Sequence, residues 1–350
     1  MKLFVTGGAG FIGSSFILHA LESDRHYSVV NYDKLTYAAN LSNLGSIADD
    51  PRYLFVRGDI CDAGAVESAM RGCDAVVHFA AESHVDRSIY EPAPVVETNV
   101  TGTFILLQMA RRIGIKRFVH ISTDEVYGDL PPGTFASEKS PLQPSSPYSA
   151  SKAAADLLVL SFVRTYGVPA LVTRSSNNYG PRQFPEKFLP LMITNALVDK
   201  PLPIYGDGMQ QRDWLHVEDN CRGILSALER GRVGEVYNLG GIDVEENLTM
   251  VKRVLRAMGK PETLLAFVKD RPGHDRRYAL DCSKAEEELG WKRMISLEEG
   301  LRRTIEWYES NPDWLDSMNV GEYRSYYEKY YDNRDSSLGA IAPAKPKTLH

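Results

Sequence analysis

The stretch Lys2-Leu-Phe-Val-Thr-Gly-Gly-Ala-Gly-Phe-Ile-Gly13 decides the fold of this chain. A short apolar strand leads into a turn with the glycine spacing GxxGxxG, and the residues after the turn predict a helix. In that turn Gly7 permits a tight bend, Gly10 lets a diphosphate approach the backbone, and Gly13 lets the helix pack closely. Because a helix N-terminus attracts anions, this arrangement is typical of a dinucleotide-binding unit.

Strand-like and helix-like segments alternate along the first half of the chain. The alternation predicts an α/β fold, a Rossmann-type doubly wound parallel sheet with helices on both faces. The predicted strands are Lys2–Thr6, Ser28–Tyr32, Tyr53–Arg57, Ala75–Phe79, Arg117–Ser122 and Ala170–Arg174. The predicted helices include Ser14–Ser23, Asn99–Ile113 and Tyr148–Tyr166.

Gly and Pro become frequent after about residue 175, which indicates a second unit. We expect a Rossmann domain over residues 1–175. The chain should cross back to this domain at about 210–240 and add a helix, Val217–Leu228, and a strand, Glu235–Leu239. Residues 176–330 should form mainly a smaller mixed lobe that binds the substrate. Its predicted helices are Asn247–Met258, Ser283–Leu289 and Leu297–Ser310. The tail 332–350 is rich in Ser, Ala, Pro and Lys and is predicted to be disordered.

The composition excludes several classes of protein. A net charge of -6 provides no global field for nucleic acid or an anionic membrane. There is no run of about 18 apolar residues that would predict a transmembrane helix, and the immediate N-terminal strand leaves no room for a signal peptide. The cysteines lack metal-ligand spacing and are expected to be reduced thiols, so we predict a cytoplasmic protein without a metal site.

Acidic and small residues at later strand ends strengthen the cofactor prediction. Asp33 ends the second strand, where a carboxylate can bind ribose hydroxyls and disfavours a 2′-phosphate, so NAD is favoured over NADP. Asp59 ends the third strand and could reach the adenine. A plain glycine turn with chance acids is the weaker alternative. The residues expected to contact NAD are Gly7, Gly10, Phe11, Ile12, Gly13, Asp33, Lys34, Thr36, Asp59, Ile60, Phe79, Ala80, Ala81, Ser83, Thr98, Tyr148, Lys152 and Asn178.

Tyr148 and Lys152 are four residues apart and share one face of a predicted helix. A phenol with a pKa near ~10 is a poor base at neutral pH. We expect the Lys152 ammonium and the positive nicotinamide ring of NAD+ to lower the pKa of Tyr148, because both favour the phenolate. Tyr148 could then accept a hydroxyl proton while NAD+ accepts a hydride. The usual alternative for this spacing is an exposed pair, and the glycine turn argues against it.

These features resemble the extended branch of the short-chain dehydrogenase/reductase superfamily that acts on nucleotide sugars. The segment Thr123-Asp124-Glu125-Val-Tyr-Gly128, at the end of the fifth predicted strand, resembles the signature of the dTDP-glucose 4,6-dehydratases. The resemblance covers roughly residues 1 to 330. Its other motifs are Ala80-Ala-Glu-Ser-His-Val-Asp-Arg-Ser88, Asn177-Asn-Tyr-Gly-Pro181, Phe184-Pro-Glu-Lys-Phe-Leu-Pro190, Asp207-Gly208, Arg212-Asp-Trp-Leu-His-Val-Glu-Asp219 and Arg271-Pro-Gly-His-Asp275.

The resemblance implies a role for each catalytic residue. Oxidation at C4 of the glucose makes the C5 proton acidic; Glu125 would remove that proton, and Asp124 would protonate the C6 hydroxyl so that it leaves as water. Hydride would then return to C6, and Thr123 would hydrogen-bond the C4 oxygen beside Tyr148. Such opposite roles need a neutral Asp124 and an ionised Glu125. Repulsion between the two carboxylates supplies part of the difference between their pKa values. The alternative is a pair of ordinary polar loop residues.

The resemblance also implies a substrate site and a homodimer. Pro203, Ile204 and Tyr205 would frame the thymine, and Arg212 and Asn247 would hold the diphosphate. The helices predicted over 99–113 and 148–166 would pair across the dimer, unless they are buried within the subunit. The expected substrate contacts are Ser83, His84, Thr123, Asp124, Glu125, Asn177, Lys187, Phe188, Pro203, Ile204, Tyr205, Arg212, Asn247, Asp270, Arg271 and His274.

Three other functions remain open at this point. A nucleotide-sugar 4-epimerase would not need an acid and a base for loss of water, so Asp124 and Glu125 count against it. A dehydratase of another nucleotide sugar, such as GDP-mannose, would differ in base preference, and UDP differs from dTDP by one methyl on the base. A non-catalytic NAD-binding regulator predicts loss of Tyr148, Lys152 or Glu125, and all three are present.

Overall fold

The computed structural model describes residues 1–23, 26–241 and 243–318. A seven-stranded sheet forms its centre, and all of its neighbouring strands are parallel. The strand order β10-β6-β5-β4-β1-β2-β3 confirms the predicted doubly wound fold. The strands are β1 (Lys2–Thr6), β2 (Ser28–Asp33), β3 (Tyr53–Arg57), β4 (Ala75–His78), β5 (Arg117–Thr123), β6 (Ala170–Ser175) and β10 (Val236–Leu239).

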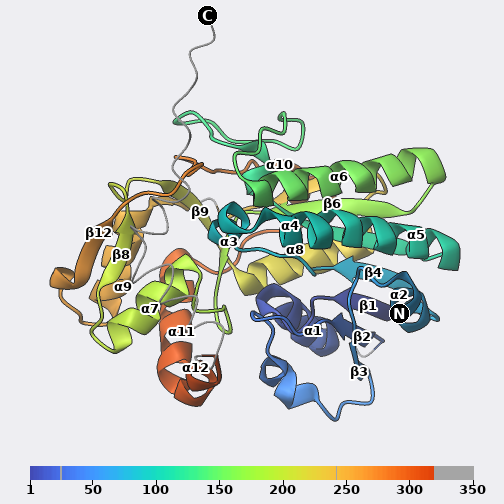
Figure 1. Ribbon diagram of the computed structural model, residues 1–350, viewed down its shortest axis with the longest axis horizontal. Coiled ribbons are helices and arrows are strands. Elements are labelled where there is room, and N and C mark those ends of the chain that lie inside the picture. Colours follow the sequence, from blue (N-terminus) through green and yellow to red (C-terminus); the bar gives the residue numbers. More distant parts are fainter. Residues whose placement is uncertain (24–25, 242, 319–350) are drawn as a thin grey trace, which may run out of the picture.

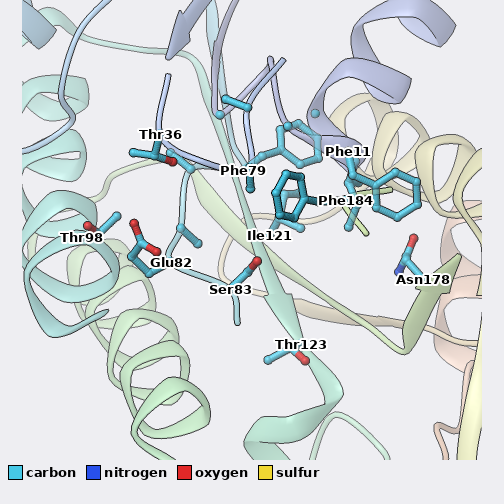
Figure 2. A pocket seen from close by; sticks show the side chains of 18 of the residues that line it. Phe11, Thr36, Phe79, Glu82, Ser83, Thr98, Ile121, Thr123, Asn178 and Phe184 are labelled. Carbon is cyan, nitrogen blue, oxygen red and sulfur yellow. The ribbon is translucent and has the colours of Figure 1, made fainter. Parts of the chain in front are cut away.

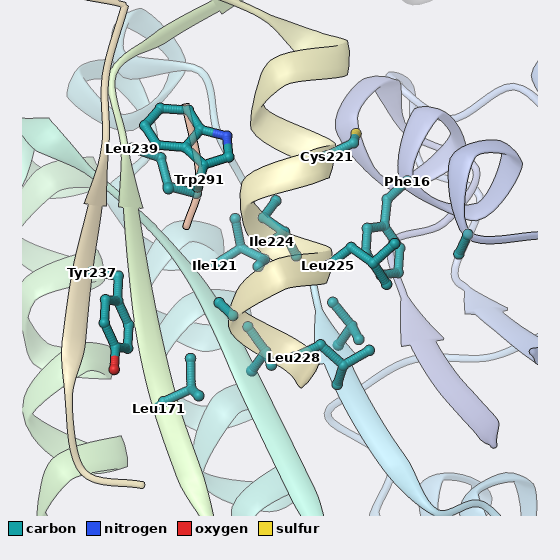
Figure 3. Packing of buried hydrophobic residues seen from close by; sticks show 14 of the residues in the cluster. Phe16, Ile121, Leu171, Cys221, Ile224, Leu225, Leu228, Tyr237, Leu239 and Trp291 are labelled. Carbon is teal, nitrogen blue, oxygen red and sulfur yellow. The ribbon is translucent and has the colours of Figure 1, made fainter. Parts of the chain in front are cut away.

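Helices cover both faces of this sheet (Figure 1). On one face α8 (Val217–Arg230) packs against α1 (Phe11–Ser23), because α8 carries apolar residues at i, i+3, i+4 and i+7, which form one stripe. Figure 3 shows these α8 side chains against the sheet and against Phe16 of α1. The opposite face is covered by α2 (Ala63–Met70), α5 (Thr103–Ile113) and α6 (Pro147–Tyr166).

The helix predicted at Ser283–Leu289 forms as α10 but belongs to the sheet instead of the lobe. It packs on α8 and β10, and its buried Ala285 and Leu289 join the core on the α8 face. Trp291 follows it and donates its indole N–H to the carbonyl of Asp219 on α8 at 2.9 Å. The packing of Ala285 and Leu289 and the hydrogen bond of Trp291 therefore place this segment against the Rossmann domain.

The smaller lobe lies to the left of the sheet in Figure 1. Its three-stranded sheet is mixed, since β9 pairs antiparallel with β11 and parallel with β7. Two further strands, β8 and β12, pair in parallel. The lobe comprises β7 (Asn177–Tyr179), α7 (Phe188–Leu197), β8 (Leu202–Tyr205), β9 (Gln211–His216), β11 (Val244–Glu246), α9 (Asn247–Ala257), β12 (Leu265–Val268), α11 (Leu297–Ser310) and α12 (Pro312–Met318).

The helix predicted over Asn99–Ile113 is interrupted at its start. The structure has a π-helical turn, η2 (Glu97–Gly102), before α5 begins at Thr103. The Asn99 side chain explains the distortion, because it accepts from Glu82 N at 2.9 Å and donates to Glu82 O at 3.0 Å. Short helices elsewhere are η1 (Leu41–Ile47), α3 (Val85–Tyr90), α4 (Pro92–Val96), η3 (Asp124–Tyr127) and η4 (Glu262–Leu264).

Within the described residues, none of the helices combines the length and apolar character needed to cross a membrane. The predicted disorder of residues 332–350 concerns a segment that lies outside the described residues.

Candidate active site

A cavity of about 310 Å³ opens at the carboxyl ends of the parallel strands (Figure 2). It lies where β1 separates β2 from β4, the point at which the strand order reverses and where doubly wound folds bind ligands. Every residue expected to contact NAD, from Gly7 to Asn178, lines it. It is also lined by residues that the sequence did not single out, namely Tyr32, Ala38, Ala39, Gly58, Glu82, Ile121, Ser122, Ser175, Ser176, Gln183, Phe184 and Glu186.

The glycine turn has the geometry that its spacing predicts. Gly7 has a φ of +70°, and a Cβ there would lie 2.5 Å from Ala80 N on the loop after β4. A Cβ at Gly13 would lie 2.2 Å from Gly7 O, so α1 could not pack against the turn. At Gly10 the nearest atom to a Cβ is Gly7 O at 3.3 Å, and the position otherwise faces open space. The Gly10 backbone is thus accessible from the cavity.

Asp33 is tied to the glycine turn by backbone hydrogen bonds. Its carboxylate accepts from Ala9 N at 2.9 Å and from Leu35 N at 2.8 Å. Burial raises the pKa of Asp33, and the two N–H donors oppose this shift. Beside it Asp59 forms an ion pair with Lys34 at 2.7 Å. Asp33 is therefore fixed relative to the glycine turn.

The residues predicted to be catalytic converge on the same cavity from two elements. Thr123 ends β5 and caps η3, because its Oγ1 accepts from Glu125 N at 3.2 Å. The hydroxyl of Thr123 also contacts Asp124 Oδ1 at 3.2 Å. From the first turns of α6, Tyr148 and Lys152 face the cavity, and Lys152 Nζ donates to Ile121 O at 2.6 Å.

The two adjacent carboxyls lie in different electrostatic environments. Burial, and next the charge of Glu125, raise the pKa of Asp124 well above its ordinary value. Burial also raises the pKa of Glu125, but the charges of Arg271, Arg212 and Lys187 oppose that shift. Burial therefore favours the protonated form of both carboxyls; a neighbouring carboxylate adds to this shift at Asp124, whereas three cations oppose it at Glu125.

The groups of the chain that surround Tyr148 act against the expected lowering of its pKa. Burial raises the pKa of Tyr148 well above its ordinary value, and the charges of Glu125 and Asp124 raise it further. Burial lowers the pKa of Lys152 to about 8. The expected lowering of the pKa of Tyr148 rested on the Lys152 ammonium and the nicotinamide ring. Burial and the neighbouring carboxylates act on this pKa in the opposite direction.

Among the residues expected to contact substrate, Ser83, Asn177 and Lys187 line the cavity together with the catalytic residues. Lys187 crosses from the lobe and donates through Nζ to Ser83 O. Arg212 and Arg271 lie outside the lining, and both are close enough to influence the charge of Glu125. The cavity is therefore bordered by cations on the lobe side.

A second group of predicted residues forms a network beside the cavity. Tyr205 OH donates to Asp86 Oδ2 at 2.8 Å, and Arg271 Nε lies 3.4 Å from Asp86 Oδ1. His274 Nδ1 lies 2.6 Å from Asp270 Oδ1, and the His274 ring meets that of Tyr205 edge-on. The structure thus joins β8, the 270–275 loop and α3 through residues that were predicted separately.

The remaining predicted residues, four in the lobe and His84 before α3, do not line the cavity. Phe188 stacks on Trp214 with ring centroids 5.9 Å apart, and Asn247 is buried at the start of α9. His84 Nε2 lies 3.4 Å from Glu186 O. Pro203 is half-buried on β8, whereas Ile204 is 0% exposed in the lobe core. The Ile204 side chain is therefore committed to packing, and only its backbone can face a ligand.

An additional cluster connects the two sides of the cavity. Arg87 Nε donates to Glu186 Oε2 at 3.0 Å, and its guanidinium lies 3.6 Å from the centroid of the Tyr37 ring. Tyr37 in turn meets the Phe184 ring edge-on at 5.7 Å. Arg87 and Glu186 both fall inside motifs of the resemblance; Arg87 was expected to face the substrate cleft, and Glu186 had no predicted role.

Comparison with known proteins agrees with this geometry. The family model described as GDP-mannose 4,6 dehydratase matches residues 4–304. A dTDP-glucose 4,6-dehydratase of Haemophilus influenzae is 52% identical over 334 residues, covering 89% of this chain and 98% of that protein. A structure of dTDP-glucose 4,6-dehydratase from Streptomyces venezuelae, solved with NAD bound, has a TM-score of 0.89 and 48% identity, covering 91% of this chain and all of that one.

More distant structures share the fold but carry another function in their names. The UDP-glucose 4-epimerase of Thermotoga maritima has a TM-score of 0.83 and 32% identity, with 89% of this chain and 100% of that chain covered. The dehydratases match this chain at higher identity than this epimerase does. The chain belongs to the GDP-mannose 4,6-dehydratase family, and within it to the dTDP-glucose 4,6-dehydratases.

Proposed function

We propose that this chain is an NAD-dependent lyase that converts dTDP-glucose to dTDP-4-keto-6-deoxyglucose. The observation that carries the proposal is the pair Asp124 and Glu125, two adjacent carboxyls with opposite environments in one cavity with Tyr148 and Lys152. Relatives with 48–52% identity over nearly their whole length are named for this reaction.

The residues of the cavity fit NAD. The open approach to the Gly10 backbone gives room for a diphosphate at the start of α1, where free N–H groups favour anions. Asp33 ends β2 at the position suited to ribose hydroxyls. Ser176, Asn178 and other small polar residues complete the lining. When bound, NAD accepts a hydride from the sugar and later returns it.

Three residues act on the proton of the C4 hydroxyl. Tyr148 takes the proton of the C4 hydroxyl, Thr123 hydrogen-bonds the same oxygen, and Lys152 stabilises the phenolate of Tyr148. Because burial and the charge of Glu125 oppose ionisation of Tyr148, its proton must leave while positive charge lies beside it.

Water loss follows from the environments of the two carboxyls. Once C4 is a ketone, Glu125 removes the acidified C5 proton, since Arg271, Arg212 and Lys187 favour its ionised form. Asp124 gives its proton to the C6 hydroxyl, which leaves as water, because burial and Glu125 keep Asp124 protonated. A proton then returns to C5. In this proposal the two adjacent carboxyls supply both the acid and the base for the loss of water.

The lobe supplies the substrate contacts in this proposal. Arg212, Arg271 and Asn247 hold the diphosphate, and Tyr205 borders the pyrimidine. Asn177, Lys187 and Phe188 contact the sugar nucleotide. We assign residues 1–175, with the return segments and α10, to the cofactor domain, and the rest of 176–330 mainly to the substrate lobe.

We further propose that the protein is a cytoplasmic homodimer. Apolar side chains remain exposed on the helices predicted to pair: Leu157 on α6 is 59% exposed, Tyr166 is 47% exposed, and Phe104 on α5 is 37% exposed. A second copy that covers them would remove apolar surface from water.

The experiment is mass spectrometry of the product after incubation of the purified protein with dTDP-glucose. Loss of one water supports the proposal. An unchanged mass with an altered sugar identifies an epimerase instead and refutes it. UDP-glucose and GDP-mannose in parallel incubations test the base preference, and the doubly substituted Asp124→Asn/Glu125→Gln protein is the inactive control.

A further inference from the structure

A row of polar side chains crosses the central sheet below the cavity, on the face covered by α5 and α6. Thr6, His78 and His120 are register partners on β1, β4 and β5. Arg174 and Asn238 are register partners on β6 and β10. Strands of a parallel sheet that is covered on both faces are usually apolar throughout, so buried polar side chains at these positions are unusual.

The centre of the row is Asp156, which is 0% exposed and lies one helical turn after Lys152 on α6. Arg174 Nε donates to Asp156 Oδ2 at 2.8 Å, and Arg174 Nη1 donates to Tyr127 OH at 2.9 Å. Tyr127 OH donates in turn to Asn238 Oδ1 at 2.8 Å. Asp156 is therefore fixed by a buried network on the catalytic helix; burial raises its pKa, and the charges of Arg174 and Lys152 oppose that shift and favour the anion.

The histidines of the row do not neutralise Asp156. His120 Nε2 lies 3.6 Å from Asp156 Oδ1, yet burial, followed by the charge of Lys152, lowers the pKa of His120 well below its ordinary value. His78 is also held neutral by burial and is bonded to Thr6 Oγ1 at 2.8 Å. The charges that face Asp156 are thus Arg174 from β6 and Lys152 from its own helix.

We propose that Asp156 is a positioning residue for the reaction, whose charge acts on the buried Lys152 one helical turn away on α6. This inference rests on the proposed function. Burial disfavours the charged ammonium of Lys152. The hydrogen-bond acceptor of this ammonium, Ile121 O at 2.6 Å, is neutral. Asp156 is the charged group that opposes the effect of burial on the pKa of Lys152. Arg174 fixes the carboxylate but cannot replace it.

The first test is the pH profile of turnover in Asp156→Asn. Loss of the negative charge lowers the pKa of Lys152 further, so the ammonium is lost at a lower pH. The alkaline limb of the kcat profile should move toward acid by at least about one pH unit, as expected for removal of a nearby opposite charge. A purely structural residue would lower kcat equally at every pH, and an unmoved limb overturns the proposal.

A second variant separates this effect from unfolding. Asp156→Asn leaves the Arg174 charge buried without its partner, which is strongly destabilising. The double variant Asp156→Asn/Arg174→Gln removes both charges and should regain thermal stability while its alkaline limb stays moved. If its limb returns to the wild-type position, the proposal is refuted. Asp219→Asn on α8, another 0% exposed carboxylate, is the matched control and should leave the limb in place.

NAD affinity measured by calorimetry against pH, without sugar, gives a readout that does not need the dehydratase reaction. The alkaline weakening of NAD binding should also move toward acid in the Asp156 variants, because Lys152 faces the cofactor cavity. If the wild type releases no water from any nucleotide sugar, the proposed function is refuted. The comparison of NAD affinity against pH in wild type and variants still decides the role of Asp156. An identical NAD profile in wild type and variants overturns that role.

Discussion

Alanine substitutions at Gly10 and Gly13 test the reading of the glycine turn, because the two methyl groups would meet different surroundings. At Gly13 the Cβ would lie 2.2 Å from Gly7 O, about 1.2 Å inside an ordinary contact of 3.4 Å, so α1 and the turn must separate. Helix propensity gains about 1 kcal/mol from Gly→Ala and overpacking costs about 1–3 kcal/mol, so Gly13→Ala should be destabilised by up to about 2 kcal/mol.

At Gly10 the methyl would touch only Gly7 O, at 3.3 Å, and would otherwise project into open space. Gly10→Ala should therefore fold with a stability within about 1 kcal/mol of the wild type. The methyl then stands where the diphosphate approaches, and an overlap that costs 1–3 kcal/mol weakens NAD binding by about 5- to 150-fold.

Urea denaturation and NAD titration of both variants distinguish the two positions. Gly10→Ala should lose affinity without stability, and Gly13→Ala should lose both. If Gly10→Ala binds NAD as tightly as the wild type, the cofactor does not approach the backbone at Gly10 and the reasoning is wrong.

Three further predictions concern the chemistry, the core and the dimer. Glu125→Gln should slow product formation by about 10²- to 10⁴-fold but leave the oxidation step, so NADH absorbance should accumulate in stopped-flow traces; full turnover would contradict the assigned base. Ile224→Ala, at a 0% exposed position on α8, should lower the free energy of unfolding in urea by about 2–5 kcal/mol, whereas the 77% exposed Met294→Ala should stay within about 0.5 kcal/mol. Leu157→Arg should yield monomers in sedimentation analysis while Val198→Arg, at a 63% exposed lobe position, leaves a dimer, and a dimeric Leu157→Arg would exclude α6 from the interface.

The central sheet could be predicted because its strands are local apolar runs bounded by turn residues. β1 and β3 have the predicted bounds, and β5 extends only one residue farther, to Thr123. The short strands of the lobe could not be predicted in this way. β7 and β11 have three residues each and exist through pairing with β9, so too little of their pattern is local.

Long-range contacts also explain the other differences from the sequence expectations. The π-helical turn at 97–102 depends on hydrogen bonds of Asn99 with Glu82, which lies 17 residues away. At the site, the identity of the catalytic residues followed from motifs and helix spacing. The elevated pKa of Tyr148 did not, because it depends on burial and on carboxylates from another element.

The turn that carries Asp124 and Glu125 is anchored by residues on either side of them. Thr123 anchors its start, and Tyr127 anchors its end through Arg174 and Asn238. Evolution can therefore exchange the two carboxyls for other residues and leave the backbone of the turn in place. An epimerase with 32% identity shares the overall architecture at a TM-score of 0.83. The divergence between isomerase and lyase would then need few substitutions and no new fold.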